Sequence, residues 1–206
     1  MNKLFTGFGK KTPARYEPVI VVSGLPRSGT SMMMKILAEG GVPIVTDELR
    51  QADPDNPNGY YELETVKQMP AGNVDWLAAA GGKAVKVISA LLEYLPSQYS
   101  FKIIFMEREI QEILASQRKM LERRNEAPGV DDPQIEEQFR KHLALIKPWL
   151  ARQPNMEMLS ISYNSLISNP EPYCRRVLEF VRVPLQLERM LSVPNGELYR
   201  NRAASR

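Results

Sequence analysis

Residues 18–40 read PVIVVSGLPRSGTSMMMKILAEG, and this stretch decides the fold. Residues 18–24 form an apolar, β-branched run without alternation, which is typical of a strand that is buried on both faces. Residues 31–39 are rich in Met, Leu, Ile and Ala and stop at Gly40 and Gly41, a glycine signal for the end of a helix. The stretch therefore predicts a strand, a glycine loop and a helix, in that order.

Three further apolar runs have the length of strands, at residues 84–88, 101–106 and 156–161. Helical periodicity fills the gaps between them. Its two clearest stripes are Ile110, Ile113, Leu114, Gln117 and Leu121, and then Ile135, Phe139, Leu143, Ile146 and Leu150. Strands that alternate with helices indicate βαβ units, so we expect an α/β fold with a parallel sheet.

The 206 residues, 43% of them hydrophobic, suffice for one sizeable core. We expect an N-terminal basic extension at residues 1–17 and a single domain at residues 18–206. The net charge of +3 is too small to indicate nucleic acid, and no stretch is long and apolar enough to span a bilayer. A single cysteine, Cys174, excludes an intramolecular disulfide, and no Cys/His cluster has zinc-site spacing. We therefore predict a soluble, cytoplasmic protein without a metal site.

The loop at residues 24–31 has the form Gly-x-x-x-x-Gly between a strand and a helix. Such a loop can aim backbone N–H groups and the helix dipole at a phosphate, and the hydroxyls of Thr30 and Ser31 can donate to its oxygens. The Walker pattern requires Lys where Thr30 stands. A cation lies instead at Arg27, whose guanidinium can bind a phosphate and its bridging oxygen. This favours a nucleotide with a reactive group on its 5′-phosphate over a triphosphate.

Residues 26–31, PRSGTS, resemble the 5′-phosphosulfate loop of the sulfotransferase family, Pro-(Lys/Arg)-Ser-Gly-Thr-(Ser/Thr). The Arg variant is similar to protein-tyrosine sulfotransferases and many bacterial members. The resemblance implies a P-loop NTPase-like three-layer domain with a central parallel sheet. It also implies transfer of a sulfuryl group from PAPS (3′-phosphoadenosine 5′-phosphosulfate) to a hydroxyl or amine of a small-molecule or glycan acceptor, with PAP as the product and no metal.

Two later segments extend this resemblance. Arg108 follows an apolar strand and Ser116 comes eight positions later on the next helix, as in the family's pair for the 3′-phosphate of PAPS. Residues 159–166, LSISYNSL, are similar to the family's strand and Tyr-Glu-x-Leu segment, which places Tyr163 against the adenine, although Asn164 replaces the common Glu. The donor-binding residues that the resemblance implies are Pro26, Arg27, Ser28, Gly29, Thr30, Ser31, Arg108, Ser116 and Tyr163.

The resemblance also indicates cations for catalysis. Arg27 is our candidate for stabilising the leaving phosphate, and Lys86, at the end of the second strand, is expected to assist it. Small-molecule sulfotransferases carry His two residues after a Lys on this strand, but Ile88 occupies that position here. We therefore expect a carboxylate base.

Two carboxylates compete for the role of base. Residues 47–50, DELR, resemble the Glu-Glu-Thr-Arg segment of the tyrosine enzymes, which makes Glu48 the leading candidate. Residues 56–62, NPNGYYE, resemble the Asn-Pro-x-Gly-Tyr-x-Glu segment of bacterial sulfotransferase-like proteins, which makes Glu62 the rival. The sequence does not choose between them.

Two other functions stay open at this stage. Acidic residues flank Arg108, and Glu107 makes residues 103–107 resemble a Walker B strand with a metal ligand, as in a magnesium-dependent nucleotide kinase or NTPase. A nucleotide-binding module without catalysis is the other. Residues 122–133 form a connection between two helices that is either a lid or a solvated linker.

Overall fold

A computed structural model describes residues 17–47, 49, 53, 56, 59–126 and 131–194. Four parallel strands form one sheet in the order β2-β1-β3-β4. Their bounds are β1 (Val19–Gly24), β2 (Ala84–Lys86), β3 (Phe101–Glu107) and β4 (Met156–Ser162). The predicted strands are thus all present and parallel.

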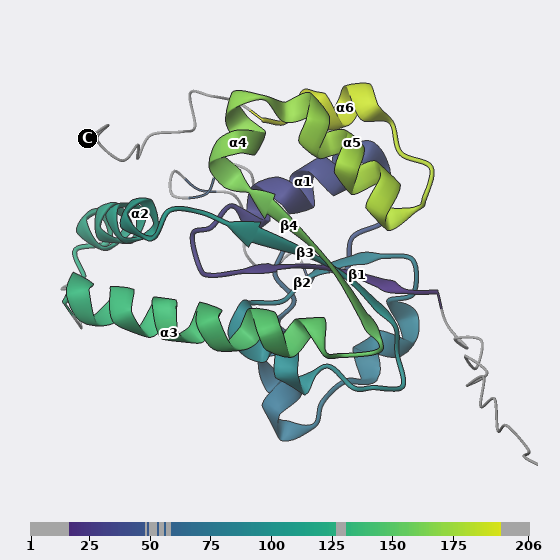
Figure 1. Ribbon diagram of the computed structural model, residues 1–206, viewed down its shortest axis with the longest axis horizontal. Coiled ribbons are helices and arrows are strands. Elements are labelled where there is room, and N and C mark those ends of the chain that lie inside the picture. Colours follow the sequence, from purple (N-terminus) through teal and green to yellow (C-terminus); the bar gives the residue numbers. More distant parts are fainter. Residues whose placement is uncertain are drawn as a thin grey trace, which may run out of the picture.

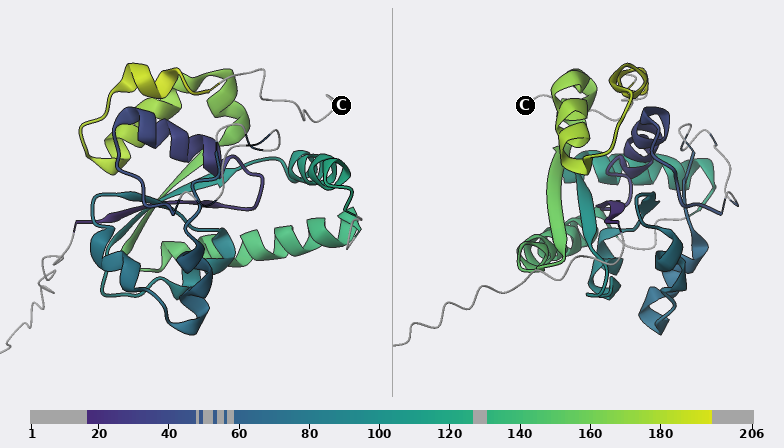
Figure 2. Two further views of the ribbon diagram at one scale, coloured as in Figure 1. Left: turned by 180° about the vertical axis from the view of Figure 1, so that it is seen from behind. Right: turned by 90° about the vertical axis from the view of Figure 1, so that its right-hand side faces the viewer.

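Helices cover both faces of this sheet and make three layers (Figures 1 and 2). One face carries α1 (Thr30–Gly40), α4 (Tyr163–Ser168), α5 (Pro170–Val181) and α6 (Leu187–Leu191). The opposite face carries α3 (Asp132–Ala151) and three 3₁₀ helices, η1 (Glu64–Ala71), η2 (Asp75–Ala79) and η3 (Ser89–Tyr94). The helix α2 (Ile110–Arg123) lies beyond the end of β3, beside α3. The predicted α/β fold with a central parallel sheet is confirmed.

The first strand is buried on both faces, as its unbroken apolar run predicts. Ile20 and Val22 join the core under α1, α5 and α6, whereas Val19 and Val21 join the core under α3 and the 3₁₀ helices. Each buried side chain of this size stabilises the fold by about 1.5–3 kcal/mol relative to exposure. The two cores together fix the sheet between its helical layers.

Some boundaries differ from the sequence prediction. The second strand ends at Lys86, because the chain turns into η3 after the N–H of Val87 donates to the carbonyl of Val22. The segment before it contains short 3₁₀ helices, since Pro70 and Gly72 interrupt longer helical structure. The connection between α2 and α3 is shorter than predicted, and residues 127–130 of it lie outside the described part.

The topology places a crevice at the carboxyl ends of β1 and β3. From the central strand β1 the chain crosses to β2 on one side and later to β3 on the other. Ligands of open α/β sheets bind where the strand order reverses in this way. Gly24, the last residue of β1, pairs with Met106 near the end of β3, so the glycine loop and Arg108 leave the sheet side by side. Among the described residues, no helix has the length and apolarity to cross a membrane.

Candidate active site

The glycine loop turns the chain sharply between β1 and α1. Gly24, Arg27 and Gly29 have φ values of 146°, 66° and 100°, and a left-handed conformation costs a non-glycine residue such as Arg27 about 1–3 kcal/mol. Gly29 is the N-cap of α1, whose first turn contains no acidic side chain. The positive end of the α1 dipole is therefore suited to an anion.

Tyr163, the first residue of α4, packs against the glycine loop. A Cβ atom on Gly29 would lie 2.9 Å from the Cε2 atom of Tyr163 and closer still to Cδ2. The guanidinium of Arg108 packs on the same ring, with its Cζ atom 4.3 Å from the centre of the Tyr163 ring. Burial raises the pKa of Tyr163, and the positive charges of Arg108 and Arg27 oppose that rise. The ring thus joins the loop to Arg108, and its contact with an adenine stays a prediction.

Arg27 and Ser116 meet, although they are 89 positions apart in the chain. The Nε atom of Arg27 donates to the Oγ atom of Ser116 on α2 at 3.0 Å. An Nη1 donor of Arg108 reaches the backbone carbonyl of Arg27 at 3.2 Å. The residues predicted for the 5′-phosphate and those predicted for the 3′-phosphate therefore form one cluster.

Arg108 is held by a buried carboxylate that the sequence analysis missed. Its Nε atom lies 3.0 Å from an oxygen of Glu112, one turn along α2, and only 2% of the Glu112 side chain is exposed. The amide of Asn164 donates to the other Glu112 oxygen at 3.0 Å. In the sequence, the i, i+4 spacing of Arg108 and Glu112 is the signal that indicates this ion pair.

Lys86 connects the opposite side of the loop to Glu62. Its ammonium donates to the Oγ atom of Ser31 at 3.2 Å and to the carbonyl of Tyr60 at 3.0 Å. An oxygen of Glu62 lies 3.6 Å from the same ammonium. The amide of Asn56 also donates to Ser31, at 2.8 Å, a contact that nothing in the sequence indicated. Glu62 therefore lies close to the glycine loop, whereas Glu48 is outside the described residues.

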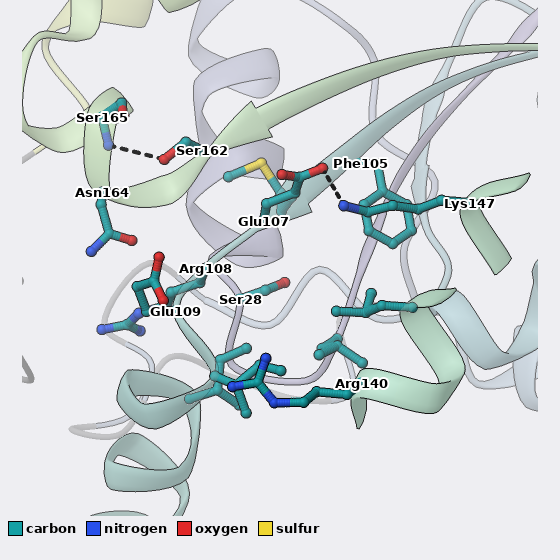
Figure 3. A pocket seen from close by; sticks show the side chains of 15 residues that line it. Ser28, Phe105, Glu107, Arg108, Glu109, Arg140, Lys147, Ser162, Asn164 and Ser165 are labelled. Carbon is teal, nitrogen blue, oxygen red and sulfur yellow. Dashed lines mark hydrogen bonds and ion pairs between the residues drawn. The ribbon is translucent and has the colours of Figure 1, made fainter. Parts of the chain in front are cut away.

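The remaining loop residues differ in exposure. Pro26 is exposed and Thr30 is buried at the start of α1. Ser28 is buried, and within the part of the chain that the structure describes its hydroxyl has no hydrogen-bond partner. Ser28 is among the residues that line a cavity together with residues of β3, α2 and α3 (Figure 3). Its predicted donor contact stays a prediction.

Glu107 has a partner on the α3 side of the sheet. One of its oxygens lies 2.8 Å from the ammonium of Lys147. Burial raises the pKa of Glu107, but hydrogen bonds from Lys147 and Ser160 and the charge of Lys147 outweigh it and leave the pKa lowered. Across the described ranges, no three His, Cys, Asp or Glu side chains cluster in a way that could hold a metal ion.

His142 on α3 is half-buried. Its Nε2 atom lies 2.9 Å from the hydroxyl of the buried Ser89 in η3. Burial lowers the pKa of His142, and the charge of Glu93 opposes that change. The residue therefore links α3 to η3 and lies outside the cluster of Arg27, Arg108 and Ser116.

The chain is an α/β protein with a central parallel sheet and a glycine loop between β1 and α1. The sulfotransferase domain profile matches residues 17–195 of the chain. The chain therefore belongs to the sulfotransferase domain family, which is a family of transferases. A comparison of the sequence with curated proteins finds no match.

Solved sulfotransferase structures share the fold at low sequence identity. Sulfotransferase STF1 from Mycobacterium tuberculosis H37Rv is 14% identical with a TM-score of 0.60, and the alignment covers 88% of this chain and 72% of that one. Mouse sulfotransferase SULT7A1 complexed with PAP is 15% identical with a TM-score of 0.55, covering 93% and 68%. The sulfotransferase domain from the curacin biosynthetic pathway is 16% identical with a TM-score of 0.51, covering 88% and 79%.

Proposed function

We propose that this chain transfers a sulfuryl group from PAPS to a hydroxyl or amine of a small-molecule or glycan acceptor, and that PAP is released. The contact between Arg27 and Ser116, with Arg108 bonded to the Arg27 carbonyl, carries the proposal. These contacts hold two groups of residues together. The N-terminus of α1 is suited to a 5′-phosphate, and Arg108 and Ser116 are suited to a 3′-phosphate. A bound PAP in the SULT7A1 structure supports the same donor class. The division into a residue 1–17 extension and one domain, and the cytoplasmic location, stay predictions.

In this reaction the acceptor oxygen or nitrogen bonds to sulfur, and the bond from sulfur to the bridging phosphate oxygen breaks. The electron pair of that bond stays on the phosphate oxygen of PAP. Arg27 and Lys86 neutralise the negative charge that develops there, while Thr30, Ser31 and the backbone of the loop hold the phosphate oxygens. The acceptor proton goes to a carboxylate.

Glu62 is the base that the described residues favour. Its carboxylate is 3.6 Å from Lys86, which is itself bonded to Ser31 of the phosphate loop. A base must lie within hydrogen-bond reach of the proton that it takes, and this position adjoins the end of the loop. Lys86 would then orient Glu62 as well as stabilise the leaving group. Glu48 stays a rival, because its placement is not described.

A magnesium-dependent kinase or NTPase has less support. The sequence has no lysine after Gly29, and the carboxylate of Glu107 is paired with Lys147 on the α3 side of the sheet. A P-loop NTPase requires both the lysine of the loop and a Walker B carboxylate that faces the phosphates. A nucleotide-binding module without catalysis would keep the Arg27 and Ser116 cluster and lack transfer.

Radiolabelled PAPS and a panel of phenols, alcohols, amines and sugars test this proposal. The chain should label at least one acceptor class, and Glu62→Gln should lower turnover by about 10²-fold or more with PAP affinity retained. Glu64→Gln is the matched control, because Glu64 is a nearby exposed carboxylate that pairs with Lys67. PAP binding without any transfer would favour the inactive module. Equal turnover of Glu62→Gln and Glu64→Gln would move the base elsewhere.

A further inference from the structure

The hydroxyl of Ser31, in the first turn of α1, accepts two hydrogen bonds. The side-chain amide of Asn56 donates to its Oγ atom at 2.8 Å, and the ammonium of Lys86 donates to the same atom at 3.2 Å. A lysine ammonium has no lone pair, so it can only donate, whereas a serine hydroxyl has two lone pairs and one proton. The two contacts therefore use the acceptor capacity of this hydroxyl and leave its proton for a third partner.

The carbonyl of Gly59 fixes the direction of the Asn56 amide. The Nδ2 atom of Asn56 donates to this carbonyl at 2.6 Å, in addition to its bond to Ser31. A carbonyl oxygen can only accept, so the amide nitrogen rather than the amide oxygen must lie on this side. The Asn56 amide is therefore a donor toward Ser31, and the Ser31 hydroxyl cannot donate to it in return.

Further hydrogen bonds hold Asn56 in this position. Its backbone N–H donates to a carboxylate oxygen of Asp53 at 2.8 Å, and its carbonyl accepts from the N–H of Gly59 at 3.0 Å. The other carboxylate oxygen of Asp53 accepts from the Tyr60 hydroxyl at 2.7 Å. An Asp side chain that bonds to nearby backbone in this way stabilises a turn. The Asn56 amide therefore meets Ser31 from a fixed direction.

The free direction of the Ser31 hydroxyl distinguishes an anion from a metal ion. In the Walker pattern the hydroxyl at this position ligates Mg²⁺ through a lone pair. Here both lone pairs receive protons, from Asn56 and from Lys86. An anionic oxygen needs the proton of the hydroxyl instead, and the dipole of α1 favours such an oxygen at this end of the helix. The contacts therefore favour a phosphate as the third partner of Ser31.

We propose that Asn56 is a positioning residue, which directs the Ser31 hydroxyl to donate its proton to the 5′-phosphate group of the nucleotide. Asn56 acts through Ser31, because its amide occupies a lone pair of that hydroxyl and so orients the proton. Without the amide the hydroxyl can rotate, and part of its contact with the phosphate is lost. This inference rests on the proposed function, which places the 5′-phosphate at the start of α1.

A double-mutant cycle of Asn56 and Ser31, with PAP as the probe, tests this role. In titration calorimetry of the full chain, Ser31→Ala should weaken PAP binding about tenfold, because a hydrogen bond to a charged group is lost. Asn56→Ala should weaken PAP binding about fivefold, since the hydroxyl is no longer oriented. The double variant should bind PAP as Ser31→Ala does, because Asn56 acts only through that hydroxyl. Asn73→Ala is the matched control, because it removes an exposed amide that donates to Gln68, and it should bind PAP as the wild type does.

Asn56→Asp keeps the size of the side chain and serves in the same cycle if circular dichroism shows that Asn56→Ala does not fold. A carboxylate only accepts, so it would draw the Ser31 proton away from the phosphate. Asn56→Asp should therefore cost more PAP affinity in the wild-type background than in the Ser31→Ala background, although its negative charge is the same in both.

Equal losses of PAP affinity in the two Ser31 backgrounds, or wild-type affinity in Asn56→Ala, would overturn the role of Asn56. The proposed transfer would survive that result, since the wild type would still bind PAP. No binding of PAP to the wild type would overturn both proposals. Coupled losses without any sulfuryl transfer would support the role of Asn56 and refute only the transfer.

Discussion

Gly29→Ala should destabilise the protein more than an alanine substitution at Gly41, a left-handed glycine whose surroundings are open. Gly29 has φ 100°, and Gly41 has φ 106°, so alanine meets nearly the same backbone penalty of about 1–2 kcal/mol at both. At Gly41 a Cβ atom meets nothing within 4 Å, whereas at Gly29 it overlaps the ring of Tyr163. Overpacking of this kind adds about 1–3 kcal/mol.

The expected free-energy loss is therefore about 2–5 kcal/mol for Gly29→Ala and about 1–2 kcal/mol for Gly41→Ala. Urea unfolding measures both values, and the displaced ring should also weaken PAP binding in Gly29→Ala alone. Because Tyr163 is the clashing partner, Gly29→Ala combined with Tyr163→Ala should lose less stability than the sum of the single variants. Equal losses for Gly29→Ala and Gly41→Ala, with additive behaviour of the double variant, would refute the packing of Tyr163 on the loop.

Other predictions follow from the same contacts. Arg108→Ala should weaken PAP binding about tenfold or more by calorimetry, because it removes a charge-assisted hydrogen bond and leaves Glu112 buried without this cation; unchanged affinity would remove the 3′-phosphate assignment. Lys86→Ala should lower turnover about 10²-fold, while Lys83→Ala, before the same strand, should not; equal rates would exclude Lys86 from the reaction. The lowered pKa of His142 means that the unfolded chain binds its proton more readily, so stability should fall as the pH drops below the ordinary value of 6.5. His142→Gln should remove that part of the pH dependence in thermal unfolding, and an unchanged profile would contradict it.

Much of the fold follows from local sequence patterns. The buried run before Gly24 and the glycine signal after α1 predicted a strand, loop and helix that the structure contains. The end of β2 was missed, because Ile88 continues the apolar run of the strand although the backbone has already turned toward η3 and left this side chain 41% exposed. Apolar character alone does not mark where strand pairing stops.

Arg27 was predicted from its place in the glycine loop, and Arg108 and Ser116 were predicted from the resemblance to the sulfotransferase pattern. The structure brings the three residues together. Glu112 was missed although it lies four residues after Arg108, because the sequence does not show that this pair is buried. Asn56 was missed because its contact with Ser31 joins two segments through tertiary packing alone. Long-range contacts of single polar side chains leave no periodic signal in a sequence.

Titration calorimetry of the chain with PAP, in the absence of magnesium, tests the central claim most directly. We predict that PAP binds, and that AMP, which lacks the 3′-phosphate, binds at least about tenfold more weakly because it forgoes the charge-assisted contacts of Arg108 and Ser116. No binding of PAP together with tight binding of ATP and magnesium would contradict the claim and identify the loop as that of a nucleotide kinase or NTPase.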